Sequence, residues 1–202
     1  MTGVVRPYRG VSAGERRSER RRRLVAACLD LVGEGGVATV TAQAVAGRAG
    51  LTRRYFYESF ADRDAVLVEA LDGMFTTLRG DILAALQTAG DAPLARARAT
   101  VRLLIATMDD PRVARLYLEA PGHPALQGRR EHAIHSYTRL LAEEVLRLGR
   151  DDPRTELAAL ILVAGITHAV TSWLAGHIQL GREELIEEIV RVSVAATVGR
   201  PG

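Results

Sequence analysis

The sequence contains little cysteine and few aromatic residues. Its 202 residues include one cysteine, Cys28, and Phe, Trp and Tyr together make up only 4%. One cysteine excludes an intramolecular disulfide and fits a reducing compartment, so we expect a cytoplasmic protein. With so few aromatic rings, the core has to be built mainly from Ala, Leu, Val and Ile, which favours helices packed on helices over a β-sandwich.

Lysine and asparagine are absent, so all 27 basic residues are Arg. This bias is typical of a GC-rich genome and is not in itself a sign of DNA binding. The distribution of charge is more informative. Residues 1–63 hold 12 Arg against 6 Asp or Glu, a net charge of +6, whereas residues 64–202 hold 15 against 18 and carry −3. A basic N-terminal third on an acidic body is typical of a protein that contacts nucleic acid at one end.

The sequence lacks the patterns that are typical of secreted proteins, membrane proteins and enzymes. The N-terminus has no apolar signal peptide. The most hydrophobic run, residues 157–175, contains Thr167, His168, Thr171 and Ser172. A spanning helix needs about 20 predominantly apolar residues, so we expect a helix buried on several sides and no membrane association. The sequence has no Gly-rich phosphate loop, no metal-ligand spacing and no nucleophile beside a base, so we expect no cofactor, no metal and no enzyme.

Apolar spacing and capping residues predict an all-α chain of about nine helices. No β-hairpin signal competes. Asp62 and Asp110 are predicted N-caps. Asp110 is followed by Pro111 at the first helical position, and Asp152-Pro153 repeats this cap-then-Pro pattern. The first four predicted helices span residues 18–32, 42–48, 52–59 and 63–88. A fifth begins at 93, and a sixth begins at 111 and ends at Pro121-Gly122. The last three span 124–148, 153 to Gly176, and 182–198.

The most informative segment is residues 40–67. A short helix, Ala42–Arg48, stops at Ala49-Gly50-Leu51, and a second begins at Thr52 with Arg53 and Arg54 in its first turn. Two short helices joined by a tight Gly turn, the second opening with hydrogen-bond donors and aromatic rings, indicate a helix-turn-helix that reads the DNA major groove. An Arg fork can bind guanine at about 1–3 kcal/mol per bidentate pair. Phe56 and Phe60 should face inward.

These residues resemble the TetR family of bacterial transcriptional regulators. The resemblance rests on Thr39-Val40-Thr41-Ala42-Gln43-Ala44-Val45-Ala46, on Arg53 to Phe60, and on Asp62-Arg63-Asp64. It implies base contacts by Gln43, Arg53, Arg54 and Tyr57, and phosphate contacts by Thr41, Thr52, Tyr55, Ser59 and Arg63. The chain departs from the family at Tyr55, where Thr or Ala is common, and at Ser59, where His or Tyr is common.

The resemblance also implies three parts: a flexible basic arm (1–14), a helix-turn-helix DNA-binding domain (15–61) and an effector-binding and dimerisation domain (62–202). The arm and first helix carry Arg6, Arg9, Arg16, Arg17 and Arg20 to Arg23, which could neutralise phosphates. The alternative is a solvated helix start, offset by Glu15 and Glu19.

The last two helices should pair with those of a second copy, since small residues such as Ala164 and Gly165 allow close approach beside a large apolar surface. A two-fold homodimer would read a palindromic double-stranded DNA operator.

The small-molecule effector is not identified by the sequence; its candidate pocket residues are Met108, Tyr117, His135, His168 and Trp173, with His123, Tyr137 and Thr171 beside them. Bound ligand would displace helix 63–88 and release DNA. An activator or a ligand-independent DNA-binding protein of the same fold is the alternative, and a helical enzyme is a remote one.

Overall fold

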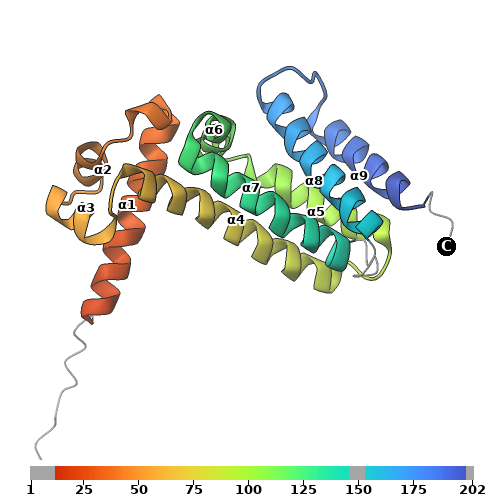
Figure 1. Cartoon of the computed structure of the whole chain (residues 1–202), viewed down its shortest axis with the longest axis horizontal. Coiled ribbons are helices and arrows are strands. Elements are labelled where there is room, and N and C mark those ends of the chain that lie inside the picture. The colour runs from red at the N-terminus through yellow and green to blue at the C-terminus, as the bar shows by residue number, and fades with distance from the viewer. Residues whose placement is uncertain (1–11, 146–152, 199–202) are drawn as a thin grey trace, which may run out of the picture.

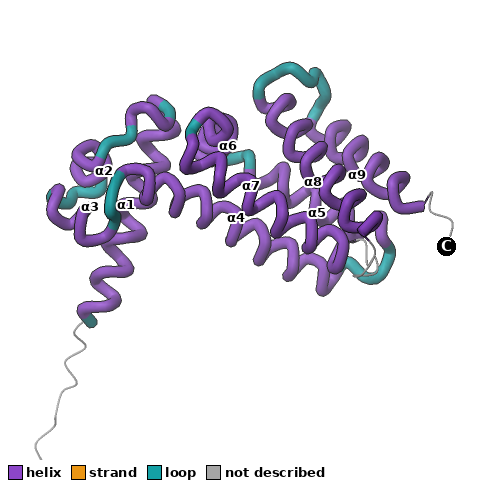
Figure 2. Tube along the Cα trace, viewed as in Figure 1, coloured by secondary structure: helices purple, strands orange, loops and turns teal. Residues whose placement is uncertain are grey.

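The computed structural model describes residues 12–145 and 153–198. Within these ranges every regular element is helical and no strand occurs (Figure 2), which confirms the all-α prediction. The α-helices are α1 (Ala13–Gly35), α2 (Ala42–Arg48), α3 (Arg53–Ser59), α4 (Arg63–Thr88), α5 (Pro93–Thr107), α6 (Pro111–Glu119), α7 (Pro124–Leu140), α8 (Pro153–Leu174) and α9 (Arg182–Val198).

Helix α1 is longer at both ends than residues 18–32. It begins after Ser12, whose side chain accepts a hydrogen bond from the Glu15 amide while Glu15 accepts from the Ser12 amide, a capping box that the prediction missed. It ends at Gly35, and Gly36 adopts a φ of 83°, which favours glycine. The last residues of the expected arm, 12–14, therefore form the start of α1, while residues 1–11 with Arg6 and Arg9 lie outside the described range.

Helices α1, α2 and α3 form a small bundle at one end of the molecule (Figure 1). Its core contains Leu24, Cys28, Val45, Phe56 and Phe60, all of them buried, as predicted for the two Phe residues. The turn between α2 and α3 passes through Gly50, with a φ of 64°, and the Leu51 amide donates to the Ala46 carbonyl at 2.9 Å. The bounds of α2 match the prediction.

Helix α4 connects this bundle to the rest of the chain (Figure 1). Asp62 caps it as predicted, its carboxylate accepting from the Ala65 amide at 2.8 Å. The 26 residues of α4 pack against α1 near one end and against α5 and α7 further along. At about 1.5 Å per residue, a single rigid rod of roughly 39 Å joins the two parts.

The C-terminal part is built by α5 to α9. Helix α5 packs against α9, and α7 packs against α8. The predicted helix 124–148 is regular only to Leu140 and then loosens into a π-helical segment, Leu141–Val145. Residues 146–152, including the predicted terminator Gly149 and cap Asp152, lie outside the described range. Asp110 caps α6 ahead of Pro111, as predicted.

The expectation that the hydrophobic run at 157–175 is buried on several sides is wrong for the single chain. By length and composition alone, helix α8 is long and apolar enough to cross a membrane. Only 17% of its most apolar 18-residue stretch is buried within the chain. Ala159, Leu162 and Val170 face the core, whereas Leu157 and Ile161 are 58% and 62% exposed. One face of α8 therefore packs within the chain, and the opposite face leaves large apolar side chains uncovered.

Candidate nucleic-acid interface and ligand cavity

The outer face of α3 carries three of the four predicted base-contacting residues. Arg53, Arg54 and Tyr57 are all exposed. The Arg53 guanidinium lies 5.5 Å from the centre of the Tyr57 ring and donates to the Tyr57 hydroxyl at 3.2 Å. Arg54 pairs with Glu58 one turn later at 2.9 Å, with its own side chain 85% exposed. Such an exposed pair contributes little to stability, so both guanidiniums are free to exchange these partners for base edges.

The inner face of α3 holds this surface in place. Phe56 has no exposed area and Phe60 is 3% exposed, and their rings lie 5.8 Å apart. The Tyr57 ring meets Phe56 edge to face at 5.4 Å. Packing on α1 therefore fixes which side of the seven-residue helix faces solvent, and the helix need not be stable by itself.

Four of the predicted phosphate-contacting residues lie around this surface. Thr41 and Thr52 are the N-caps of α2 and α3; the Thr41 hydroxyl accepts from the Ala44 amide at 3.1 Å, whereas Thr52 makes no side-chain cap bond. Tyr55 is 39% exposed beneath the Arg20 guanidinium, and the Ser59 hydroxyl donates to the Tyr55 carbonyl. Gln43, the fourth predicted base contact, is exposed in the first turn of α2.

Arg63, the fifth predicted phosphate contact, is directed elsewhere. Its Nε donates to Asp64 at 3.0 Å and its Nη2 lies 3.0 Å from the His123 Nε2. His123 is the N-cap of α7, so Arg63 joins α4 to the C-terminal part instead of extending toward the α3 surface. The physical reason is local: both partners lie within reach of the first turn of α4.

The arginines of α1 divide into two groups, a division that the sequence did not reveal. Arg21 binds Glu69 and the Ser59 carbonyl and lies 4.2 Å from the centre of the Phe60 ring, and Arg23 donates to the Ala49 carbonyl. These two fasten α1 to its neighbours. Arg22 is 75% exposed and pairs only with Glu19 on its own helix. The expectation that the whole cluster neutralises phosphates therefore needs correction for Arg21 and Arg23.

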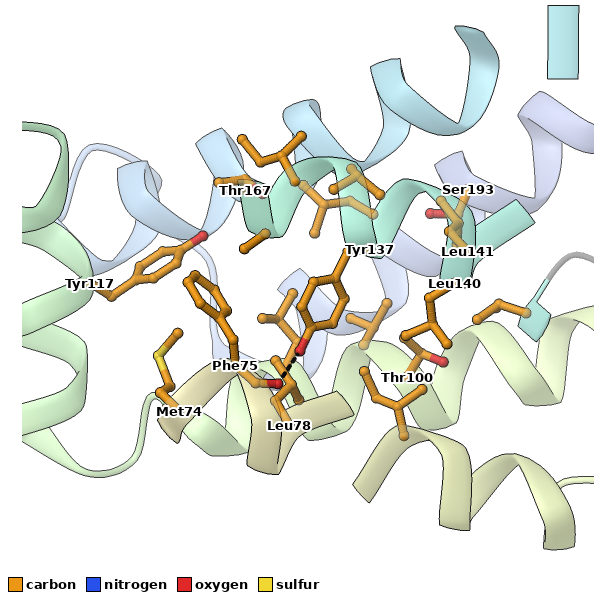
Figure 3. Close-up of a pocket in the computed structure, with 18 of the residues that line it drawn as sticks. Met74, Phe75, Leu78, Thr100, Tyr117, Tyr137, Leu140, Leu141, Thr167 and Ser193 are labelled. Carbon is orange, nitrogen blue, oxygen red and sulfur yellow. Dashed lines mark hydrogen bonds between the residues drawn. The ribbon is translucent and has the colours of Figure 1, made fainter. Parts of the chain in front are cut away.

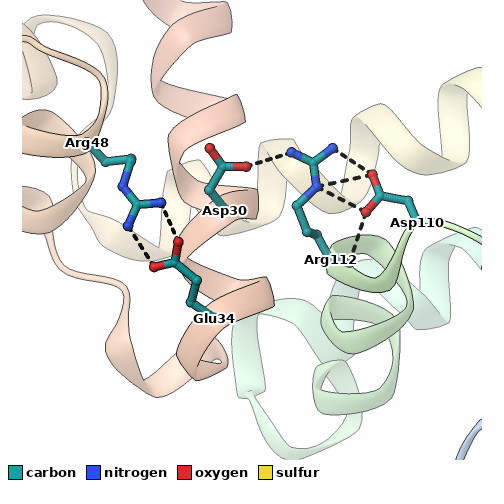
Figure 4. A network of polar contacts seen from close by, with 5 residues as sticks. All are labelled: Asp30, Glu34, Arg48, Asp110 and Arg112. Atoms are coloured by element: carbon teal, nitrogen blue, oxygen red, sulfur yellow. Dashed lines mark hydrogen bonds and ion pairs between the residues drawn. The ribbon is translucent and has the colours of Figure 1, made fainter.

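A polar network joins the end of α1 to α6 (Figure 4). Arg112 reaches from α6 to Asp30 at 2.6 Å and also binds Asp110. On the next turn, Arg115 donates to the Gly33 carbonyl at 3.1 Å, and Glu119 accepts from the Val37 amide at 2.7 Å. The Arg112 guanidinium lowers the pKa of Asp110 below its usual value.

Glycines permit this close approach between α1 and α6. A Cβ at Gly33 would lie 2.6 Å from the Arg112 Cγ, and one at Gly36 would lie 2.6 Å from a Glu119 carboxylate oxygen. From the sequence alone, Gly33, Gly35 and Gly36 after residue 32 indicate only the end of a helix. In the structure Gly33 is helical and serves instead as a contact surface for α6.

A cavity of about 90 Å³ lies among α4, α5, α6, α7, α8 and α9. Tyr117 and Met74 lie at one end and Leu141 and Ser193 at the other (Figure 3), and the Tyr137 hydroxyl donates to the Phe75 carbonyl at 2.8 Å. Burial raises the pKa of Tyr117 and of Tyr137, so both hydroxyls are protonated donors at neutral pH.

Only part of the predicted effector pocket coincides with this cavity. Met108 and Tyr117 line it, as does Tyr137. His135 and His168 do not, because both are exposed on the outer sides of their helices. Trp173 does not either, since it lies at the end of α8, where its indole N–H donates to the Leu180 carbonyl at 2.9 Å. The sequence-based prediction did not include Phe75 and Arg130, which also line the cavity. Phe75 follows Leu67 and Leu71 at four-residue spacing within helix 63–88, and this apolar spacing could have identified it.

Comparison with known proteins identifies the fold. No protein-family model matches the chain, and no curated protein matches it in sequence. Among solved structures, the fatty acid degradation regulator FadR from Bacillus halodurans superposes with a TM-score of 0.74 at 15% identity, covering 90% of this chain and 97% of that one. A TetR-family transcriptional regulator from Streptomyces coelicolor gives 0.69 at 18%, covering 87% and 81%.

A third structure, the multidrug binding protein EbrR complexed with malachite green, gives a TM-score of 0.68 at 22% identity, covering 88% of this chain and 98% of that one. The similarity therefore extends over the helix-turn-helix bundle and the C-terminal helices alike. This chain has the fold of the TetR-family transcriptional regulators.

Proposed function

We propose that this protein is a sequence-specific DNA-binding transcriptional regulator, acting as a dimeric, ligand-released repressor in the cytoplasm. The observation that carries the proposal is the outer face of α3, where Arg53, Arg54 and Tyr57 project from a helix that is fixed from behind by Phe56. Donors and a flat ring on a short, rigid helix are the groups that read base edges in the major groove.

The proposed dimer forms through α8 and α9. Leu157 and Ile161 on α8 and Val192 on α9 are large apolar side chains with 58%, 62% and 47% of their surface exposed. Contiguous apolar surface of this kind marks a protein interface or a membrane contact. An interface suits the fold better, because a two-fold axis through these helices presents two α3 helices to a palindromic operator with half-sites about 34 Å apart.

The proposed release of DNA runs through the helices that line the cavity. Tyr117 of α6 and Met74 of α4 both face it. On its other side, α6 holds the end of α1 through Arg112, Arg115 and Glu119. A ligand that widens the cavity would therefore shift α4 and α6, and with them the bundle that carries α3. The cavity favours a ligand-responsive regulator over a ligand-independent one.

An enzymatic role has little support. The only thiol, Cys28, is fully buried, and burial raises its pKa to about 12, so it is not a reactive nucleophile. Within residues 12–145 and 153–198, no three His, Cys, Asp or Glu side chains gather as a metal site would require. His132 and His135, three residues apart on α7, are both exposed.

Selection of genomic DNA fragments by the purified protein, near physiological salt, tests the proposal. We expect enrichment of a two-fold palindrome, which would also identify the target genes. As a control, Arg139→Ala, on the exposed side of α7, should enrich the same site, whereas the double variant Arg53→Ala/Arg54→Ala should not. Retention of all fragments alike, weakened by salt and without a shared site, would show that the basic end binds only phosphates and would contradict the regulator proposal.

A further inference from the structure

We propose that the cavity binds an apolar molecule carrying a single carboxylate, and that the guanidinium of Arg130 holds this carboxylate. The inference deepens the effector site of the function proposed above, because it names the chemical class of the ligand. It depends on the cavity itself and can be tested without DNA.

The cavity wall is almost entirely hydrocarbon. Its side chains come from six helices, α4 to α9, and from the π-helical segment, and they include Leu78, Ile82, Val101, Leu104, Ile134 and Ile166. Such a wall favours a ligand whose body is apolar, because burying that body removes hydrocarbon from water. At about 90 Å³, the cavity is far below the roughly 300–1,000 Å³ of pockets for drug-sized ligands. The ligand is therefore slender, or it widens the cavity as it enters.

Among the described residues that line the cavity, Arg130 alone carries a charged side chain. Its Nε is buried and has no hydrogen-bond partner, and none of the described carboxylates lies within ion-pair distance of its guanidinium. Two other arginines of the C-terminal part are matched: neighbouring Arg129 pairs with Asp72, and buried Arg96 donates to the carbonyls of Leu86, Gly90 and Glu144. The Tyr117 hydroxyl is the polar group of the protein that interacts with Arg130. A partly buried cation without a negatively charged partner is unfavourable, so an anionic ligand would supply the charge that the described residues do not.

The groups around Arg130 favour one carboxylate in particular. Its guanidinium lies 5.8 Å from the centre of the Tyr117 ring, and Thr167 lines the same end of the cavity, with the Tyr117 hydroxyl directed toward it (Figure 3). One guanidinium and two hydroxyls can hydrogen-bond both carboxylate oxygens. A phosphate with two negative charges would exceed the single positive charge of Arg130, and a protonated amine would be repelled by that charge. The hydrocarbon body would then extend toward Leu140 and Leu141.

Calorimetry of the full-length protein with octanoate, 1-octanol and octylamine tests the inference, because the three probes share a chain and differ in head group. We expect octanoate to bind at least about tenfold more tightly than octanol, and octylamine to bind most weakly. Arg130→Gln should remove that tenfold preference and leave octanol binding unchanged, while Arg130→Lys should retain most of it. Arg139→Gln, an exposed arginine on the same helix, is the matched control.

Equal binding of octanoate and octanol, a preference for octylamine, or unchanged octanoate affinity in Arg130→Gln would overturn the inference. So would the absence of binding across a series from butanoate to dodecanoate. Thermal unfolding of each variant shows that the fold is retained, and the comparison of head groups on the unmodified protein needs no variant. Because no DNA is present, a failed operator selection leaves this result intact. Octanoate that binds without releasing operator DNA would support the ligand class and contradict ligand-released repression.

Discussion

Arginine side chains have two distinct roles at the N-terminal end of this protein. Arg53 and Arg54 project into solvent from α3, whereas Arg21 and Arg23 bind carbonyl and carboxylate groups of neighbouring elements. Composition cannot separate the two roles, because every one of these residues is an arginine in a basic segment. Substitutions can separate them, since one group should affect DNA binding and the other the stability of the fold.

Replacing Arg53 with Ala should relax sequence preference. We expect the affinity for a selected operator to fall by about 10- to 100-fold, the equivalent of about 1–3 kcal/mol for a lost bidentate base contact. Binding to random duplex should change much less. Fluorescence anisotropy with both duplexes at one salt concentration measures the ratio. Equal losses on operator and random DNA would mean that Arg53 contacts phosphate only.

Replacing Arg21 with Ala should destabilise the helix bundle. Arg21 loses its bonds to Glu69 and Ser59 and its contact with the Phe60 ring, and we expect the free energy of unfolding to fall by about 1 kcal/mol, a modest value because the side chain is 41% exposed. Arg22→Ala, which loses only an exposed pair with Glu19, should change it by less than about 0.5 kcal/mol. Urea unfolding without DNA compares the two, and equal effects would contradict the division.

At the scale of elements, α6 is the connection between the cavity and the bundle of α1, α2 and α3. Its nine residues place Leu116 and Tyr117 in the core and Arg112, Arg115 and Glu119 against the end of α1. A helix this short is unstable alone. Its position therefore depends on its contacts with both neighbours, and a change on one side is transmitted to the other.

The Asp110 cap of α6 should give a pH-dependent contribution to stability. Arg112 holds the pKa of Asp110 below its ordinary value of 3.8, so the contribution is present above about pH 4 and is lost as the pH falls through the lower folded-state pKa. Asp110→Asn should therefore be less stable than the unmodified protein at pH 7, by up to about 1 kcal/mol, and the difference should shrink below about pH 4.

Urea titrations at several pH values measure this difference. Asp81→Asn, at an exposed position on α4, is the control and should show no comparable change. A difference between Asp110→Asn and the unmodified protein that persists undiminished at acidic pH would show that the carboxylate charge on Asp110 is not its source.

At the scale of the whole molecule, α8 and α9 leave large apolar side chains exposed that a single chain does not cover. The long rod of α4 separates the bundle that carries α3 from α8 and α9 (Figure 1), so a partner that covers these last two helices would leave α3 accessible. The architecture therefore suits pairing at one end and DNA binding at the other.

Ile161→Glu should prevent dimer formation. Ile161 is 62% exposed in the single chain, and burying an unpaired carboxylate at an interface costs several kcal/mol. We expect the dimer dissociation constant to rise by at least about 100-fold, with loss of palindrome binding and retention of helical content. Sedimentation velocity measures the mass. Ala84→Glu, exposed on α4, is the control; an unmodified chain that sediments as a monomer would refute the dimer.

The features that the sequence alone determined are local. The bounds of α2 and α9, the caps at Asp62 and Asp110 and the inward-facing Phe56 follow from residues within a few positions of one another, because caps, turns and helical periodicity act over one or two turns. The shared location of the three exposed side chains was predictable for the same reason, since Arg53, Arg54 and Tyr57 belong to a single seven-residue helix; that they read DNA stays a prediction.

Only the tertiary structure decided the remainder. It paired Arg63 with His123, placed Arg130 beside Tyr117 with no partner for its Nε, and excluded His135, His168 and Trp173 from the cavity. The sequence also missed the approach of α6 to Gly33. Each of these contacts joins residues that lie far apart along the chain or depends on which side of a helix faces its neighbours. Packing between helices sets both, and no local pattern of residue types specifies it.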